Sequence, residues 1–376
     1  MIVGVAEAPL EEGRLGPGTV LSAQAEVGRA ALAEAGLTFA DVDGLATAGA
    51  WGLLPTLALG EYLGIQPRFV DGTNVGGSSF EVHVGHAARA IERGDAEVVV
   101  VLYGSRQRSD RGRTLGPRSN DLGAQFDAPH GLPTPVGAYA LAAARHMHVY
   151  GTTHEQLAEI AVATRKWAAL NPAATFRDEI TIEDVLESPP ICDPLHLLDC
   201  CLVTDGAGAV VLTTAEHARA LEVAPVYVRG HGESQTHWSI TQMPDLTVTP
   251  ARESGAAALA QAGITLDDVD VTELYDSFTI TVLLTLESLG FCGPGEGGAF
   301  VSGQRTAPGG DFPLNTNGGG LSALHPGMYG IFLLIEAVRQ LRGECGERQV
   351  EGAKIALVNG TGGVLSSTST CVLATS

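Results

Sequence analysis

Cysteine and histidine are the residue types of this chain that most readily support metal or nucleophilic chemistry. No two cysteines have the C-x-x-C spacing of a zinc site, which favours reduced and mostly buried thiols. His83 and His86 lie three residues apart on one face of a predicted helix, but no third ligand is evident, so packing is the preferred interpretation. The sequence therefore predicts no metal site. The six cysteines are Cys192, Cys200, Cys201, Cys292, Cys345 and Cys371.

Two glycine-rich turns are further places where chemistry could occur. The first reads GTNVGGSSF from Gly72, and the second reads NTNGGGLSA from Asn315. Each turn is followed by an apolar, helix-like stretch and then by a β-rich run, at 98–104 and 355–360. A phosphorylated ligand is compatible with the negative net charge of the chain, because a few local Arg residues or helix N-termini are enough to bind it.

The elements that position these turns occur twice. Residues 30–45, AALAEAGLTFADVDGL, return as residues 257–272, AALAQAGITLDDVDVT. A repeated strand–turn–helix–strand order predicts a duplicated α/β domain. We expect an N-terminal half over 1–225, with a loop excursion at about 105–200, and a C-terminal half over 226–376. Duplication brings related turns face to face, which predicts a site at their junction.

Local signals place individual elements within this repeat. A helix with a capping signal should begin at Thr153, with Gln156 three residues later, and 171–194 should be irregular. Asp205 is expected to be a turn or cap residue. Strands are predicted near 2–6, 42–46, 97–103, 201–214 and 270–274, and helices near 23–35, 79–93, 250–261 and 326–342.

Composition limits the classes of function. The chain has 376 residues, enough for two sizeable cores, and its formal net charge is −21. Nucleic acids and anionic membranes bind clustered Lys and Arg, so neither is an expected partner. Apolar runs stay below the ~20 residues of a membrane span, and the first residues lack a signal-peptide pattern. We therefore expect a cytoplasmic protein.

Several motifs together resemble the thiolase superfamily, especially its sterol-carrier-protein thiolase branch. The resemblance implies an α/β fold of two βαβαβαββ halves in a five-layer αβαβα arrangement. It also implies a homodimer that acts on acyl-coenzyme A, with coenzyme A as part of the substrate and no covalently bound cofactor. The motifs are NVGGSSFEVHVGHAARAI (74–91), DCCLVTDGAGAVVL (199–212), ELYDSFT (273–279), LGFCGPGEGGAFV (289–301), NTNGGGLSALHPGMYG (315–330) and VNGTGG (358–363).

The departures from this family change the expected chemistry. Working thiolases carry a nucleophilic cysteine at or beside the position of Gly76, and a second cysteine in the turn matched by 358–363. This chain has neither, and Cys371 lies too far along, in a predicted final strand. Because Claisen-type acyl transfer needs a covalent acyl carrier, ordinary thiolase activity is rejected.

Two tyrosines suggest a different reaction. Tyr275 stands where the family's E-x-H-D-x-F motif has histidine, and Tyr329 follows the retained His325 in LHPGMYG (324–330). This pattern resembles the thiolase-like aldolases that cleave steroid side chains. The resemblance implies retro-aldol cleavage of a β-hydroxyacyl-coenzyme A, such as a 17-hydroxy steroid thioester, to a ketone and propionyl- or acetyl-coenzyme A. Tyr275, Tyr329 and His325 would be catalytic. The alternative is that these residues only pack in the protein interior, with Tyr275 hydrogen-bonded to Asp276.

The substrate's thioester oxygen would be held by the glycine-rich turns. The expected binding residues are Gly76, Gly77, Ser78, Asn317 and Gly362. The basic run Arg106–Arg113 could contact coenzyme A phosphates, although a solvated loop is the preferred interpretation.

Two other functions are compatible with the sequence, and the resemblance also implies a partner protein. The chain could be a non-catalytic acyl-coenzyme A scaffold, or an atypical thiolase that uses a displaced thiol such as Cys292. The resembled aldolases work with a separate DUF35-type OB-fold protein, often carrying a zinc ribbon. This resemblance implies such a partner on another polypeptide.

Overall fold

The first half of the chain forms a mixed five-stranded sheet. The computed structural model describes residues 1–49, 54–110, 122–133 and 135–376. The strand order is β1-β7-β4-β2-β3, in which β2 pairs in parallel with β3 and β4, and β7 is antiparallel to β4 and β1. The strands are β1 (Ile2–Glu7), β2 (Gly44–Thr47), β3 (Phe69–Asp71), β4 (Val98–Ser105) and β7 (Gly206–Thr213).

The second half repeats this topology in a four-stranded sheet. Its order is β8-β11-β10-β9, with β9 parallel to β10, and β11 antiparallel to both β10 and β8. A parallel bridge from Thr272 to Leu314 stands where the fifth strand would be. The predicted duplicated fold is therefore confirmed. The strands are β8 (Tyr227–Gln235), β9 (Val271–Leu274), β10 (Ile355–Gly362) and β11 (Ser367–Ala374).

The repeated sequence folds in the same way in both halves. Thr38–Asp41 and Thr265–Asp268 each form a capping box on one turn of 3-10 helix that leads into β2 or β9. In the first half the Asp43 carboxylate accepts the first N–H of β4, and in the second half Asp270 accepts the first N–H of β10. Equivalent hydrogen bonds therefore give both copies of this segment the same structure.

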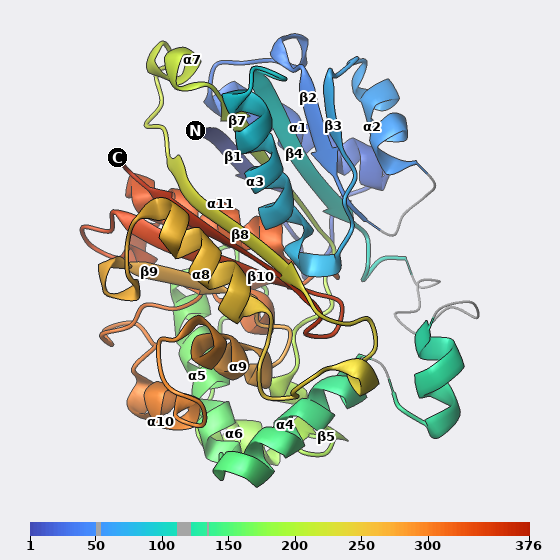
Figure 1. Cartoon of the computed structure of the whole chain (residues 1–376), viewed down its shortest axis with the longest axis vertical. Coiled ribbons are helices and arrows are strands. Elements are labelled where there is room, and N and C mark those ends of the chain that lie inside the picture. Colours follow the sequence, from blue (N-terminus) through green and yellow to red (C-terminus); the bar gives the residue numbers. More distant parts are fainter. Residues whose placement is uncertain (50–53, 111–121, 134) are drawn as a thin grey trace.

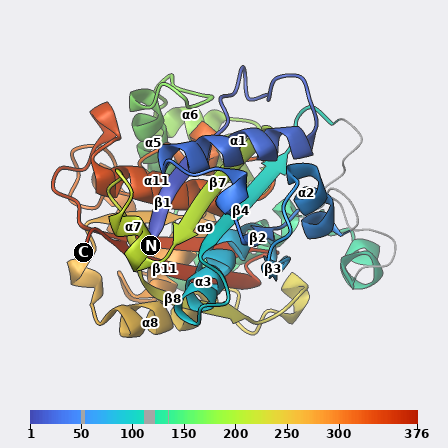
Figure 2. The same ribbon diagram turned by 90° about the horizontal axis from the view of Figure 1, so that it is seen from above.

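Helices cover both sheets in five layers. Helices α3 and α11 lie between the sheets and contact strands of both, α1 and α2 cover the outer face of the first sheet, and α8 and α9 that of the second. The two sheets lie one above the other in Figure 1, and Figure 2 shows α1 and α8 on opposite sides of the molecule. These helices are α1 (Val20–Glu34), α2 (Pro55–Leu63), α3 (Ser79–Glu92), α8 (Ala251–Ala262), α9 (Thr279–Leu289) and α11 (Gly330–Arg342).

The excursion between β4 and β7 differs from expectation because much of it is helical. Thr153 and Gln156 form the predicted capping box on α5. Helix α4 was not predicted, because Pro135 precedes it and no side chain caps it. The expectation of an irregular 171–194 is wrong at α6, which Thr181 and Asp184 cap. The excursion contains α4 (Val136–Tyr150), α5 (His154–Leu170), α6 (Ile182–Glu187), β5 (Pro190–Cys192) and β6 (Leu195–His196).

The core between the sheets draws on both halves. Phe80 from α3, Phe332 from α11, Val99 from β4 and Val358 from β10 belong to one buried cluster. Two short helices, α7 (Ala215–Arg219) and α10 (Gly297–Val301), lie outside it. Among the residues described, no helix is both long enough and apolar enough to cross a membrane.

Candidate active site

The glycine-rich turn before α3 lies against the last glycine-rich turn of the chain. Gly76 has a φ of +81°, and a Cβ atom there would lie 2.6 Å from the backbone nitrogen of Gly363. At Gly362 a Cβ atom would lie 1.7 Å from the carbonyl oxygen of Val75. The backbone therefore occupies the space that a side chain would need at either glycine.

Tyr275 fills the space beside the first turn. A Cβ atom on Gly77 would lie 2.2 Å from the Tyr275 ring, so the ring rests directly on the glycine backbone. Tyr275 follows β9, and its backbone N–H donates to the carbonyl of Asn359 on β10, 3.0 Å away. The second half of the molecule thus delivers this tyrosine to a turn of the first half, as the predicted junction requires.

The three predicted catalytic residues come together. The Tyr275 hydroxyl is 2.9 Å from Nε2 of His325, and the backbone N–H of Tyr329 donates to the Tyr275 hydroxyl oxygen at 3.1 Å. All three side chains are buried. The alternative bond from Tyr275 to Asp276 is wrong, because the Asp276 carboxylate instead accepts the N–H of Gly320 at 2.7 Å.

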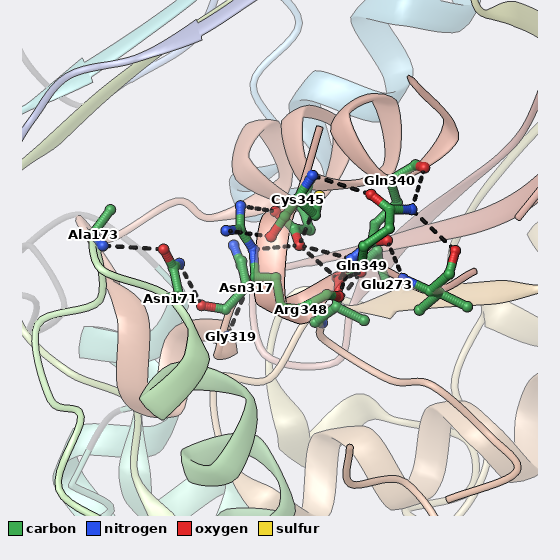
Figure 3. Close-up of polar contacts among 12 residues, drawn as sticks. Asn171, Ala173, Glu273, Asn317, Gly319, Gln340, Cys345, Arg348 and Gln349 are labelled. Atoms are coloured by element: carbon green, nitrogen blue, oxygen red, sulfur yellow. Dashed lines mark hydrogen bonds and ion pairs between the residues drawn. The ribbon is translucent and has the colours of Figure 1, made fainter. Parts of the chain in front are cut away.

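Asn317 fixes the hydroxyl of the second tyrosine. Its Oδ1 accepts the Tyr329 O–H at 2.9 Å and the Gly319 N–H at 2.7 Å, so it holds a side chain and a turn together. The Asn171 side chain donates to the Asn317 carbonyl at 2.8 Å, as Figure 3 shows. The structure therefore places Asn317, predicted to bind the thioester oxygen, as a support for Tyr329.

A buried polar cluster lies behind this segment (Figure 3). The Thr316 hydroxyl is 2.9 Å from Glu273 and 2.7 Å from Glu336, and Arg348 pairs with Glu336 at 2.9 Å. Burial first, and the nearby Glu336 second, raise the pKa of Glu273 well above its usual range. The Thr316 backbone N–H also donates to Glu273, at 3.3 Å. Thr316 therefore connects the two carboxyl groups, and these bonds fix the backbone just before Asn317.

Burial sets the protonation state of the catalytic candidates. It raises the pKa values of Tyr275 and Tyr329 well above 10, so both phenols keep their protons at neutral pH. It lowers the pKa of His325 to about 4, which leaves the imidazole neutral and able to accept through Nε2. We therefore assign the proton in the Tyr275–His325 bond to the tyrosine, because its oxygen already accepts from Tyr329.

Two neighbours of the site were not assigned these roles from the sequence. Asp276 also accepts the N–H of Leu321 at 3.1 Å, and so fixes the turn that leads to His325. Cys201 lies close enough to Tyr275 to affect its pKa, and burial raises the pKa of the Cys201 thiol well above its usual range. Asp276 could have been predicted to lie at the site, because it directly follows Tyr275 in the sequence. Cys201 could not, because no nearby residue of its own segment belongs to a motif of the site.

Other predicted residues have structural partners. The Ser78 hydroxyl is fully buried and donates to Ser367 at 3.2 Å, so its side chain is turned toward β11. His83 is bonded to the carbonyl of Thr73, and His86 to Asp71. Within the described part of the chain, no group of three His, Cys, Asp or Glu side chains gathers as a metal ion would require.

Cys292 lacks the properties of a displaced nucleophile. Burial raises the pKa of its thiol to about 12, and the carboxylates of Glu287 and Glu296 add to this shift. A thiol must lose its proton to attack a thioester, so this one is almost wholly unreactive at neutral pH.

A pocket of about 210 Å³ opens next to Asn317. Asn317 and Leu324 line it together with Pro9 and Leu10, which follow β1, whereas Tyr275, His325 and Tyr329 do not line it. Asn317 is the residue that binds the Tyr329 hydroxyl, and Leu324 directly precedes His325. The pocket therefore reaches the residues that hold the site.

Comparison with known proteins places this geometry in a family. Residues 232–375 match the family described as thiolase C-terminal domain-like. The chain is 38% identical to the 17-hydroxy-3-oxo-4-pregnene-20-carboxyl-CoA lyase of Mycobacterium tuberculosis, over 88% of this chain and 89% of the relative. It is 37% identical to the steroid side-chain-cleaving aldolase of Thermomonospora curvata, over 89% and 88% of the two chains.

A similar solved structure is also that of an aldolase, as is one of the sequence relatives. The structure of an Ltp2-ChsH2(DUF35) aldolase superposes with a TM-score of 0.89 at 33% identity, over 99% of this chain and 97% of that one. The fold, the buried pair of tyrosines and these similarities agree with one another. The chain therefore belongs to the thiolase superfamily, in the branch that contains the steroid side-chain-cleaving aldolases.

Proposed function

We propose that this protein is a carbon–carbon lyase that cleaves a β-hydroxyacyl-coenzyme A by a retro-aldol reaction. The substrate is a 17-hydroxy steroid side-chain thioester, and the products are a ketone and propionyl- or acetyl-coenzyme A. The observation that carries this proposal is the buried cluster of Tyr275, His325 and Tyr329 at the site where thiolases use cysteines. The similarity to a lyase and an aldolase named for such substrates supports the substrate class.

Tyr275 and His325 would remove the proton from the substrate hydroxyl. The hydroxyl donates to the Tyr275 oxygen while the Tyr275 proton moves along its 2.9 Å bond to Nε2 of His325. A phenol alone is a weak base at neutral pH, so the neutral imidazole behind it supplies the proton acceptor. The carbinol carbon becomes the ketone as its bond to the carbon beside the thioester breaks.

The broken bond leaves its electron pair on the thioester as an enolate. The enolate's negative charge forms together with the positive charge on His325, so the two compensate each other in a buried site. The backbone N–H groups of Gly77 and Ser78, at the start of α3, would hold the enolate oxygen, whereas the Gly76 N–H already donates to the Asn74 side chain at 3.3 Å. One such donor can lower the barrier by roughly 3–4 kcal/mol.

Tyr329 would then protonate the enolate carbon. Its hydroxyl is held by Asn317 in a fixed direction, and its ring lies 5.8 Å from that of Tyr275, centre to centre. His325 then gives up its proton and the Tyr329 oxygen takes one up, which restores the starting state. The cycle consumes no cofactor, because the proton taken from the substrate hydroxyl balances the one delivered to carbon.

The experiment is to incubate the purified chain with the steroid β-hydroxyacyl-coenzyme A and to quantify the short acyl-coenzyme A by mass spectrometry. Tyr275→Phe and Tyr329→Phe should release it far more slowly than the wild type. Tyr150→Phe is the control, because Tyr150 lies at the end of α4 and is 38% exposed. Product from the wild type and the control, with little from the two site variants, supports the lyase. A wild-type protein that binds the thioester and releases nothing would establish the scaffold alternative.

The assembly is a separate proposal. We propose a homodimer that binds a DUF35-type OB-fold partner, since the similar aldolase structure is a complex with a DUF35 protein. Strand β3 is an edge strand with Val70 49% exposed, and Leu57 on α2 is 66% exposed, which suits an apolar subunit contact. Light scattering of the chain alone and with its candidate partner tests both steps. A monomer, or unchanged mass on mixing, contradicts them.

A further inference from the structure

Two histidines of α3 hold the segment that enters the first glycine-rich turn. Nε2 of His83 lies 2.9 Å from the Thr73 carbonyl oxygen, and because a carbonyl can only accept, this nitrogen carries the proton. The Asp71 carboxylate, at the end of β3, accepts the Thr73 N–H at 2.8 Å and lies 2.7 Å from Nδ1 of His86. Both the N–H and the carbonyl of Thr73 are therefore bound, one by each histidine's partner atom.

His86 also connects the two halves of the molecule. Its Nε2 lies 3.2 Å from a carboxylate oxygen of Glu233 on β8, while its Nδ1 faces Asp71 on β3. An imidazole can donate through both ring nitrogens only when it is protonated, so His86 is an imidazolium in this arrangement. The hydrogen bond to Asp71 is the main cause that raises the pKa of His86 above its usual value. We call this Asp71–His86–Glu233 arrangement the clamp.

The far end of the turn is held by Ser79. Its Oγ accepts the Val75 N–H at 3.0 Å and donates to the Gly76 carbonyl at 2.7 Å. Gly77, whose N–H would hold the enolate oxygen, lies between this anchor and the one at Thr73. The direction of the Gly77 N–H therefore depends on how firmly both anchors fix the backbone between them.

We propose that His86 is a positioning residue for this turn, and that its imidazolium acts through Asp71. The inference rests on the proposed function, because it concerns the turn that would hold the enolate oxygen. While His86 carries its proton, Asp71 is tied to Glu233 in the other half of the molecule and keeps the Thr73 N–H in one direction. A neutral ring can donate to only one of the two carboxylates, and that bond is weaker because it is no longer charge-assisted on both sides. Turnover should therefore depend on the charge of His86.

The groups around His86 define the pH range in which this dependence is visible. Burial lowers the pKa values of His83 and His231 to about 4, so both stay neutral while His86 titrates. Because the pKa of His86 is raised in the folded protein, the clamp is complete at pH 6.5 and is lost as the pH rises through the raised value. The charged and titratable side chains that face His86 or share its partners are Asp71 from β3, Glu233 and His231 from β8, and His83 and Arg89 from α3 itself.

Three variants separate the charge of the clamp from its shape. His86→Gln removes the charge and keeps a polar side chain, whereas His86→Lys keeps a charge that persists to about pH 10. The His86 side chain is 32% exposed, which leaves room for the longer lysine. Arg68→Gln is the matched control, because Arg68 precedes β3 and forms an ion pair of the same 2.7 Å length with Asp43, at the opposite end of the strand from Asp71. Urea unfolding verifies that each variant folds.

The first measurement is kcat and KM for the steroid β-hydroxyacyl-coenzyme A between about pH 6 and 9. At pH 6.5, His86→Gln should lower kcat about tenfold, the usual value of a hydrogen bond to a charged group, with little change in KM. The ratio of the wild-type kcat to that of His86→Gln should fall toward one as the pH rises, since the wild type then loses the same charge. His86→Lys should keep a high kcat over the whole range.

Two other buried groups titrate in the same pH range, in the wild type and the variants alike. Burial raises the pKa of Asp276 to about 7 and that of Glu81 to about 8, so the ratio of two kcat values, rather than either profile, reports on His86. A ratio that does not change with pH, an effect confined to KM, or an equal loss in Arg68→Gln would overturn the proposal.

Hydrogen exchange tests the clamp without the reaction. Peptides that cover residues 72–80 should exchange about tenfold faster in His86→Gln than in the wild type at pH 6.5, and His86→Lys should restore the slow rate. This pattern in a protein that cleaves nothing would support the clamp and refute the lyase. Cleavage with the same exchange rate and kcat in all variants would support the lyase and refute the clamp. Faster exchange in His86→Gln with an unchanged kcat would also refute a positioning role.

Discussion

Tyr275→Phe separates catalysis from packing at this site. The change removes one oxygen and keeps the ring that rests on Gly77. It leaves the Tyr329 N–H without its acceptor and His325 Nε2 without its donor, in a site where all three residues are buried. Two unsatisfied buried groups should lower the free energy of unfolding by ~2–4 kcal/mol. Loss of a positioned acid/base group should lower kcat by about 10²–10⁴-fold.

The assay is single-turnover release of the short acyl-coenzyme A, with urea unfolding measured on the same preparation. Tyr103→Phe is the matched control, because the buried Tyr103 hydroxyl donates to the Pro326 carbonyl at 2.6 Å and accepts the Met328 N–H at 3.1 Å. It should lose similar stability and less than about tenfold in kcat. If both variants lose the same turnover, or if Tyr275→Phe turns over normally, Tyr275 is a packing residue and the assigned mechanism fails.

Three further changes test other parts of the site. Gly77→Ala should displace the Tyr275 ring, since the new Cβ would lie 2.2 Å from it, and should abolish turnover; a folded and fully active variant would contradict this contact. Asn317→Ala removes the acceptor of the Tyr329 hydroxyl and should lower kcat more than it raises KM, with a change confined to KM counting against a positioning role. Glu81 is fully buried, has no hydrogen-bond partner for either carboxylate oxygen within the described residues, and burial raises its pKa to about 8. Because the folded protein binds this proton more tightly than the unfolded chain, Glu81 makes stability fall as pH rises from about 4.5 to about 8. Glu81→Gln should therefore be more stable than the wild type at pH 8 but not at pH 4, and urea unfolding at the two pH values would reveal an unchanged pH dependence if the reasoning is wrong.

The motif residues were predictable one by one, but their contacts were not. The tyrosines stood out at Tyr275 and Tyr329 because they interrupt motifs in which a different residue is usual. Asn317 was assigned to the substrate because it lies in a glycine-rich turn, and only the fold turns its side chain to Tyr329. The basic run was interpreted as a solvated loop, and sequence does not reveal that the Asp205 carboxylate accepts the backbone N–H groups of Arg108 and Ser109. Residues 111–113 of this run lie outside the described residues.

The sequence by itself determined the duplicated fold and the absence of the thiolase nucleophiles. The fold is determined locally, because the repeated segment at 30–45 and 257–272 forms its own capping box in each half. The absence of the cysteines is visible directly in the sequence. Tertiary structure alone decided the protonation states of Tyr275, Tyr329 and His325, because each depends on burial by segments far away in the chain. It also decided that the first half's Gly77 meets the second half's Tyr275, a contact between chain segments about two hundred residues apart that loop closure and core packing establish together.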